Sequence, residues 1–486
     1  MMAILNRTQE LPRDRAKLYE RASEVLLHQW DFETKEGLTD PELKRYLYNI
    51  DLRDKKEILR LVANAMQAGE KGLAANLIYR EDLERILAQY LESTGIGKRD
   101  ANDLTDLIIK QLRHRNFILC SLGGNTFAFV HRTFLEYFCA CQFYERFKKR
   151  GLEGGITLEE LKTEVFGQHW SDSSWREVLR LIIGMLSAEF PKDIADELIN
   201  YLIDLDGKEK EFSNIFLAVD CFSELRNRSA HGEVSQRLLD YLQSLTKLDR
   251  EFVINKNLQE KAVSTIGTIW QDDPIAWRVL QFIAQSRNVW FVKEEAVNQL
   301  SIIAKIHGEA LSFLQQLAQK GESRARAISA LAKHWRDEPE TFPIIQQLAQ
   351  KGEWSAIDAL AKHWRDDPQT FPFIQQQAQK GEWSAIYVLA EHWPDEPETF
   401  PIIQQQAQKG EWSAIYVLAE HWPDEPETFP IIQQQAQKGE WSAISALAEH
   451  WHDEPETLPI IQQLAQKAEG SAIYVLARYY PELELT

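Results

Sequence analysis

Residues 117–147, FILCSLGGNTFAFVHRTFLEYFCACQFYERF, contain two different hydrophobic periods, one after the other. Two apolar runs, residues 117–122 and 126–130, are separated by Gly-Gly-Asn, a sequence typical of a β-hairpin turn. After His131 the apolar residues recur at three- and four-residue spacing, which predicts a helix. The segment therefore predicts a two-stranded hairpin followed directly by a helix.

Three helical patterns come before this segment, at residues 56–66, 81–91 and 102–113. Each has apolar residues on one face at the period of an α-helix. Three helices, a two-stranded wing and a closing helix together predict a winged-helix module over residues 51–150.

Part of the module also resembles a known signature. Residues 129–140, Phe-Val-His-Arg-Thr-Phe-Leu-Glu-Tyr-Phe-Cys-Ala, resemble the F-x-H-x-(S/T)-F-x-E-(F/Y)-x-A motif of NACHT-type STAND NTPases, which include animal NOD-like receptors and bacterial NACHT proteins. Residues 11–31, with Leu-Pro-x-x-Arg at their start, resemble the helical segment that closes the nucleotide domain of this family. The resemblance covers about residues 1–180. It implies a winged helix that folds back on a bound nucleotide and holds the protein in its closed state.

The phosphate-binding loop of such NTPases is not found in the sequence. No G-x-x-x-x-G-K-[S/T] string occurs, and the nearest, residues 92–99, has Glu92 at the first Gly position and Arg99 at the Mg²⁺-binding hydroxyl. We therefore expect the carboxyl portion of a bacterial NACHT protein, or one half of a split one. This chain would not be an enzyme by itself. It would have no cofactor of its own and would meet ATP or ADP only together with an NTPase domain.

Composition narrows the class of protein further. The 486 residues carry a formal net charge of -19, which disfavours nucleic acid as a partner. Four cysteines argue against a disulfide framework and for a reducing compartment. The first twenty residues lack the apolar core of a signal peptide, and the longest apolar run, residues 178–186, contains Arg180 and is too short to span a bilayer. We expect a cytoplasmic protein with no membrane partner.

His131 is the candidate nucleotide-sensing residue. In related NACHT proteins the matching histidine contacts the β-phosphate of ADP, and the resemblance implies the same for His131. An imidazole can donate a hydrogen bond to phosphate, and a helix start offers free N–H groups to an anion. The alternative is a histidine satisfied locally at the end of a strand. Glu136 is expected to form a structural ion pair or cap. His131, Cys139 and Cys141 also suggest zinc, but Cys-x-Cys on a helix points its thiols apart and no fourth ligand is suitably spaced, so we expect no metal.

Winged helices often bind DNA, which leaves a second interpretation of this module. Its basic residues are Lys98, Arg99, Lys110, Arg113, His114 and Arg115. They can equally form a solvated face or pair with acidic neighbours. The acidic balance of the chain makes DNA binding the weaker interpretation.

The second half of the chain is repetitive. An Ala-Ile pair recurs every 29 residues, at Ala327, Ala356, Ala385, Ala414, Ala443 and Ala472. Residues 378–406 are identical to residues 407–435. Each unit reads as two short helices separated by a Pro-containing loop, which predicts an α-solenoid whose units resemble HEAT repeats. The complete prediction is an all-α-dominated fold with four parts: the end of a NACHT helical lobe (1–50), the winged helix (51–150), a helical linker domain (151–250) and the solenoid (251–486, with the 29-residue period from about 323).

Each unit also predicts particular roles for its aromatic and polar side chains. The tryptophans at 354, 383, 412 and 441 and at 335, 364, 393, 422 and 451 are expected to be core, because a seam between helices needs bulk. A histidine row and acidic loops are the candidate ligand-binding surface, represented by His363, His392, His421, Glu396 and Glu425. The leading hypothesis is the sensor portion of a NACHT signalling or antiviral-defence protein, binding a protein ligand and working with a separate NTPase subunit or an oligomer. The alternatives are a stand-alone repeat scaffold and a winged-helix DNA regulator.

Overall fold

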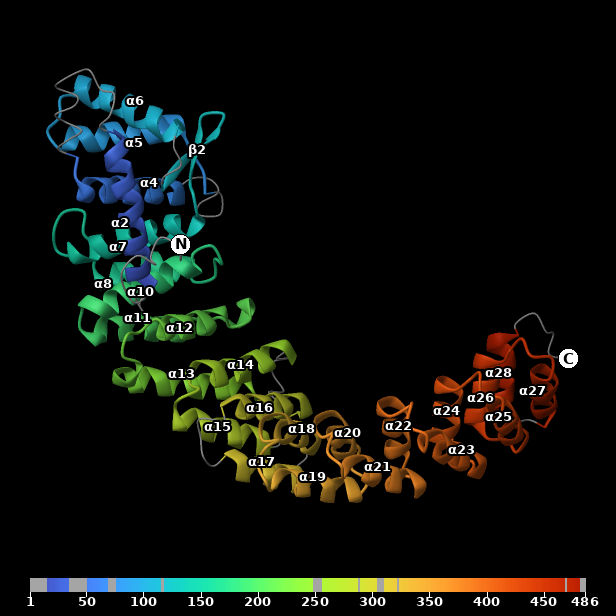
Figure 1. The fold of residues 1–486 in the computed structure, drawn as a ribbon. Coiled ribbons are helices and arrows are strands. Elements are labelled where there is room, and N and C mark those ends of the chain that lie inside the picture. The colour runs from blue at the N-terminus through green and yellow to red at the C-terminus, as the bar shows by residue number, and fades with distance from the viewer. Residues whose placement is uncertain are drawn as a thin grey trace. The chain divides into compact units, whose positions relative to one another are not determined.

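The computed structural model describes residues 15–34, 50–68, 76–114, 118–247, 256–286, 289–303, 310–320, 323–467 and 470–480. The described elements are helices apart from one three-stranded sheet, as Figure 1 shows. The prediction of an all-α-dominated fold is therefore confirmed. The chain divides into two compact units, Met1–Leu245 and Thr246–Thr486. Residues 35–49, within the stretch predicted to be the end of a NACHT helical lobe, lie outside the described residues.

The first unit contains the predicted winged helix. Its three helices, hairpin and closing helix are all present. The elements up to residue 148 are α2 (Arg15–Thr34), α4 (Leu52–Ala68), β1 (Ile78–Tyr79), α5 (Arg80–Ser93), α6 (Lys98–His114), β2 (Leu119–Gly123), β3 (Thr126–Phe129) and α7 (Arg132–Lys148).

The wing depends on its Gly-Gly-Asn turn. Gly123, Gly124 and Asn125 have φ values of 93°, 54° and 62°, a region that glycine enters at little cost and asparagine tolerates. The sheet has a third strand that the sequence did not reveal, in the order β1-β3-β2, with Ile78 opposite Phe127. Two residues are too short to show alternation, so only their pairing with β3 identifies them as a strand.

Helix α7 is the centre of this unit. Phe134, Phe138 and Phe147 are at most 1% exposed, and the ring of Phe138 stacks on Phe129 of β3 at 6.0 Å between centroids. The helix packs against α4 and α10, with contacts to α2 and β3. Burial of so many large side chains fixes the direction of α7, and with it the position of His131 just before its first turn.

Four longer helices follow, where the linker domain was predicted. They are α10 (Arg176–Glu189), α11 (Lys192–Asp204), α12 (Ser213–Ser223) and α13 (Gly232–Leu245), preceded by the short α8 (Leu158–Glu160), η2 (Leu161–Phe166) and α9 (Gly167–His169). Arg15 at the start of α2 ties this group to the winged helix. Its guanidinium lies 2.5 Å from Glu177 Oε1 and 2.9 Å from Glu224 Oε1. The Leu-Pro-x-x-Arg string therefore ends in a structural ion pair.

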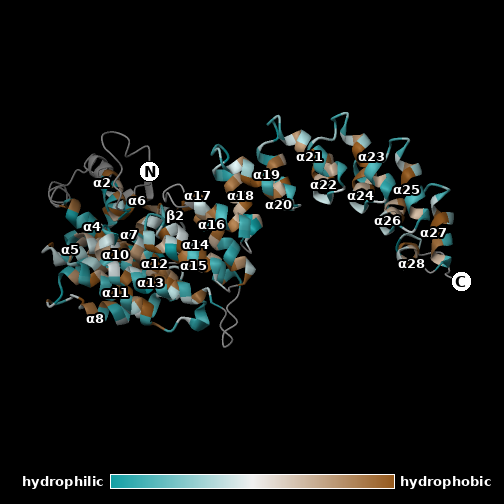
Figure 2. Ribbon diagram, turned by 90° about the horizontal axis from the view of Figure 1, so that it is seen from below, coloured by the Kyte–Doolittle hydropathy of each residue, from teal (hydrophilic) through white to brown (hydrophobic). Residues whose placement is uncertain are grey.

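The second unit is an array of helix pairs. The helices are α14 (Lys256–Ile269), α15 (Pro274–Gln285), α16 (Trp290–Ile303), α17 (Ala310–Lys320), α18 (Arg324–His334), α19 (Thr341–Gln350), α20 (Trp354–His363), α21 (Thr370–Gln379), α22 (Trp383–His392), α23 (Thr399–Lys409), α24 (Trp412–His421), α25 (Thr428–Gln437), α26 (Trp441–His450), α27 (Thr457–Gln466) and α28 (Gly470–Tyr479). Even-numbered helices from α18 contact one another in one layer, and the odd-numbered helices form the other. The connecting loops are hydrophilic (Figure 2). The predicted α-solenoid is confirmed.

Successive repeats are joined by an apolar core and by buried amides. Ile386 and Leu389 of α22 are fully buried, as are their counterparts in α24. Gln406 of α23 is 1% exposed and its Nε2 donates a 2.7 Å hydrogen bond to the Gln379 carbonyl at the end of α21. Gln435 makes the same 2.7 Å bond to Gln408 one repeat later. Because carbonyl groups at the ends of α21 and α23 are satisfied by a side chain of the next repeat, these units are complete only when they are stacked.

Candidate functional site

His131 lies between the wing and α7. Strand β3 ends at Phe129, whose backbone is held by the Asn76 side chain: Asn76 Nδ2 donates to the Phe129 carbonyl at 2.9 Å and Oδ1 accepts from its N–H at 3.2 Å. Val130 N then donates to Ile118 O at 2.9 Å. His131 follows as the N-cap residue of α7, with extended backbone. Its side chain is exposed, and its ring makes no hydrogen bond to any described residue.

The first turn of α7 supplies further polar groups beside His131. No side chain caps this helix start. Thr133 Oγ1 is buried and has no hydrogen-bond partner among the described residues. Arg132 is held by Glu136, with Nε and Oε1 2.9 Å apart. Burial raises the pKa of Glu136, and the Arg132 charge opposes that rise. The predicted ion pair of Glu136 is present, and the imidazole of His131 lies exposed beside the uncapped start of α7.

Residues 15–143 match the protein family described as the winged helix-turn-helix domain C-terminal to NACHT. This part of the chain is a NACHT-associated winged helix. No curated protein matches the chain. The resemblance seen in the sequence is thus confirmed over this range, which begins at the first residue of α2 and ends within α7. The match includes His131, Thr133 and Glu136.

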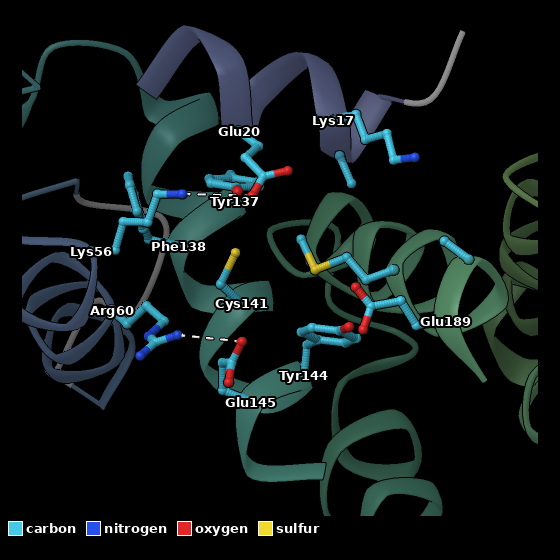
Figure 3. A pocket seen from close by; sticks show the side chains of 13 residues that line it. Lys17, Glu20, Lys56, Arg60, Tyr137, Phe138, Cys141, Tyr144, Glu145 and Glu189 are labelled. Carbon is cyan, nitrogen blue, oxygen red and sulfur yellow. Dashed lines mark ion pairs between the residues drawn. The ribbon is translucent and has the colours of Figure 1, made fainter. Parts of the chain in front are cut away.

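One pocket lies inside the first unit, between α2, α4, α7 and α10 (Figure 3). It holds about 190 Å³ and is lined by both cations and carboxylates, with Cys141 facing it. Lys56 Nζ lies 3.5 Å from Glu20 Oε1, and Arg60 Nη1 lies 3.6 Å from Glu145 Oε1. Lys56 and Arg60 are paired with carboxylates that line the same pocket, so their charge is neutralised and does not favour a bound phosphate. His131 is not among its lining residues.

The cysteines of the NACHT-associated winged helix are packed groups. Cys139 is fully buried and its Sγ donates to Gln67 Oε1 at 3.3 Å. Burial raises the pKa of Cys139, and it raises the pKa of Cys141 to about 12, so both thiols stay protonated at neutral pH. In the described part of the chain, no three His, Cys, Asp or Glu side chains gather as metal ligands.

The basic residues considered for DNA binding are not a uniform patch. Lys98, Arg99 and Lys110 are exposed on α6, and Asp103 and Asp106 are exposed on the same helix. The side chains of Arg113, His114 and Arg115 lie outside the described residues. Within the described ranges, no helix is both long enough and apolar enough to cross a membrane.

The structure places the predicted ligand-binding residues of the repeats in two settings. His363 and His392 are half-buried and His421 is exposed, and each packs against the tryptophan that follows it, at 5.6 to 6.3 Å between ring centroids. Burial, followed by the charge of Arg336, lowers the pKa of His363. Glu396 and Glu425 are exposed in the turns between the two helices of a repeat. Among the described residues, no hydrogen bond or ion pair joins these histidines to Glu396 or Glu425.

The prediction that the repeat tryptophans are core is wrong for one of the two sets. Trp364 and Trp393 are 5% and 7% exposed, and Trp335, Trp422 and Trp451 are half-buried. The tryptophans that begin the even-numbered helices are instead exposed: Trp354 by 46%, Trp383 by 43%, Trp412 by 45% and Trp441 by 57%. The Ala and Ile side chains that follow them already fill the seam between helices. The sequence does carry a signal for this exposed face. Trp383, Tyr387 and Glu391 are spaced i, i+4 and i+8, so they form one stripe along the helix, and a stripe that ends in Glu is expected to face solvent.

Proposed function

We propose that this chain is the regulatory and sensor portion of a NACHT signal-transduction or antiviral-defence protein. In this proposal the repeats bind a protein ligand, and the winged helix couples that event to a nucleotide-controlled switch. The observation that carries the proposal is the match of residues 15–143 to the winged helix C-terminal to NACHT, together with an exposed His131 at the start of α7. The four described cysteines are all free, which fits a reducing cytoplasm.

His131 acts in this mechanism as a donor to a phosphate that another domain holds. Its ring can donate one hydrogen bond to a β-phosphate oxygen of ADP, and the positive end of α7 favours the same anion. The NTPase domain supplies the nucleotide site and any hydrolysis, and this chain supplies no catalytic residue. The contact therefore stabilises only the state in which the winged helix rests against ADP.

The ligand works by preferring the other state. A protein bound to the repeats shifts the switch only if it binds more tightly when the winged helix has left the nucleotide. Each tenfold difference in affinity shifts the equilibrium by about 1.4 kcal/mol. A single hydrogen bond from His131 to the phosphate contributes a free energy of similar size. A ligand with a modest preference for the open state can therefore offset the loss of this bond and free the winged helix from the nucleotide.

The test measures nucleotide retention in a complex of this chain with its NACHT domain, expressed together. His131→Ala is expected to release labelled ADP about 5- to 30-fold faster than the wild-type complex, because a charge-assisted hydrogen bond contributes roughly 1 to 2 kcal/mol. His452→Ala, a matched change at an exposed histidine of the repeats, is expected to leave release unchanged. Equal ADP release from the wild-type and His131→Ala complexes would remove His131 from the mechanism.

The same preparation separates the alternatives. A chain that never associates with a NACHT domain but still binds a protein partner would be a repeat scaffold. A DNA regulator would show salt-dependent binding to duplex DNA that Lys110→Ala weakens. The exposed Asp103 and Asp106 on the same helix support the NACHT proposal over this one.

A further inference from the structure

The even-numbered helices of the repeats present one solvent-facing stripe each. In α22 the exposed residues are Trp383, Tyr387 and Glu391, and all residues between them are buried. In α24 the corresponding exposed residues are Trp412, Tyr416 and Glu420. Residues four apart on a helix lie one above the other, about 6 Å apart along the axis. Each helix therefore carries an indole, a phenol and a carboxylate in line.

Neighbouring stripes are aligned, so they form rows across the helices. The ring centroids of Trp354 and Trp383 are 6.5 Å apart, and those of Trp383 and Trp412 are 6.2 Å apart, with rings within 27° of parallel. The negative charge of Glu420 is the largest cause of a raised pKa at Tyr416, with smaller contributions from burial, Tyr387 and Glu449. We call this surface the Trp–Tyr–Glu face, defined by Trp383, Tyr387, Glu391, Trp412, Tyr416 and Glu420.

The flanking helices limit the face. In α26 the stripe is Trp441, Ser445 and Glu449, so the aromatic middle position is lost while the carboxylate stays. In α20 the stripe is Trp354, Asp358 and Lys362, and Lys362 Nζ lies 2.9 Å from Asp358 Oδ1. In α28 the last position is Arg478. Negative charge beside aromatic rings is therefore concentrated on α22, α24 and α26, between the Asp358–Lys362 ion pair of α20 and Arg478 of α28.

We propose that the Trp–Tyr–Glu face binds an extended segment of a partner protein that carries arginine at every second position. Alternate side chains of an extended chain lie about 6.6 Å apart. This repeat matches the 6.2 and 6.5 Å steps between the tryptophan rings. An extended segment crossing the helices therefore places one side chain on each repeat, and its register is set by the protein.

The chemistry of the face selects the guanidinium group. A cation within about 6 Å of an aromatic centroid is attracted by the ring, and arginine can stack on indole where lysine cannot. A guanidinium seated on the indole of Trp383 or Trp412 follows the register of the tryptophan row. The Glu carboxylate two helical turns along the same helix adds its attraction for the cation. The net charge of -19 adds long-range attraction for a basic segment.

This inference deepens the proposed function, because it names the class of ligand that the repeats detect. Its test uses the whole chain without nucleotide, so a failure here leaves the ADP-release result unaffected. The probe is a fluorescein-labelled peptide of five Arg-Ser pairs, with a peptide of five Lys-Ser pairs as the equally charged comparison. Binding is measured by fluorescence anisotropy at two salt concentrations, and folding of each variant is checked by circular dichroism.

The Arg-Ser peptide is expected to bind more tightly than the Lys-Ser peptide. The double variant Trp383→Ala/Trp412→Ala is expected to lose roughly 5- to 30-fold in affinity for Arg-Ser, since two cation–π contacts are removed, and to lose the preference over Lys-Ser. Trp290→Ala is the matched control, because Trp290 is 66% exposed in the same unit but stands outside the row. It is expected to bind as the wild type does.

The carboxylates are tested in the same way. Glu391→Gln/Glu420→Gln is expected to weaken binding about 2- to 10-fold and to flatten its salt dependence. Glu396→Gln/Glu425→Gln removes the same charge from the loops and is expected to have a smaller effect. The proposal is overturned if the loop variant loses more than the helix variant, if Trp383→Ala/Trp412→Ala binds normally, or if the wild type does not distinguish Arg-Ser from Lys-Ser.

Discussion

The repeats offer the same heptapeptide in two settings, and this allows a direct test of how stacking stabilises the array. Ser-Ala-Ile-Tyr-Val-Leu-Ala occurs at residues 384–390 in α22 and at residues 471–477 in α28. Its isoleucine is fully buried as Ile386 and 42% exposed as Ile473. We predict that Ile386→Ala destabilises the protein by about 3 to 4 kcal/mol and Ile473→Ala by about 1 to 1.5 kcal/mol.

The difference follows from burial alone. Replacing isoleucine by alanine removes three carbon atoms, each contributing about 0.8 kcal/mol when buried, or about 2.4 kcal/mol in all. At Ile386 the removed atoms leave a closed cavity, which raises the cost toward the upper part of the range measured for such changes. Ile473, at 42% exposure, loses only a little over half of the transfer free energy, and its space opens to water without forming a cavity.

The assay is native-state hydrogen exchange read by mass spectrometry, with urea unfolding followed by circular dichroism as a second measurement. Exchange is needed because repeat arrays depart from two-state unfolding, and a single midpoint averages over repeats. Ile386→Ala should speed exchange in α22 and its neighbours, whereas Ile473→Ala should act on α28. Equal losses of stability for the two variants would refute the idea that stacking, and not local sequence, determines the contribution of a repeat.

Four further outcomes are expected. Thr399 is fully buried with no partner for its hydroxyl among the described residues, so Thr399→Val should raise the free energy of unfolding by about 1 kcal/mol in urea titrations; a loss of that size would show that the hydroxyl is satisfied. Arg15→Met should destabilise the first unit by roughly 1 to 3 kcal/mol, because it leaves Glu224 with Arg180 as its remaining partner. Faster hydrogen exchange in α2 would show this loss. The pKa of Glu136 is raised in the folded protein, so its contribution to stability is complete at low pH and is lost as pH rises through the folded pKa. The melting temperature of Glu136→Gln relative to the wild type should therefore be higher at pH 7 than at pH 4. Cys141, with a pKa of about 12, should resist iodoacetamide at pH 8 in the folded protein and react after unfolding, and rapid labelling of the native chain would contradict this.

Much of the fold could be predicted from local patterns. The Gly-Gly-Asn turn and the change of period after His131 identified the wing and α7, since both signals lie within a few residues. The 29-residue repeat identified the solenoid, because identical units must make identical interfaces. Strand β1 was missed because Ile78 and Tyr79 become a strand only through a partner nearly fifty residues away.

The candidate sites were harder to predict, because exposure depends on neighbours that a single repeat does not show. Trp383 looks like core by its size, yet Ala385 and Ile386 occupy the seam and leave the indole outside. The role of Arg15 was equally hidden, since its partner Glu224 is more than two hundred residues away in the sequence. By contrast, the motif around His131 predicted the start of a helix at this residue, and in the structure His131 is the N-cap residue of α7.

The Gln406 bond to Gln379 and the Gln435 bond to Gln408 join consecutive repeats by the same atoms at the same 2.7 Å distance. Any repeat can consequently dock on any other of its kind. Loss or gain of one 29-residue block by recombination between the duplicated gene segments would rejoin compatible surfaces and extend or shorten the aromatic row by one step. The length of the aromatic row, and with it the length of the segment that we propose it binds, can therefore change in evolution without a new kind of junction.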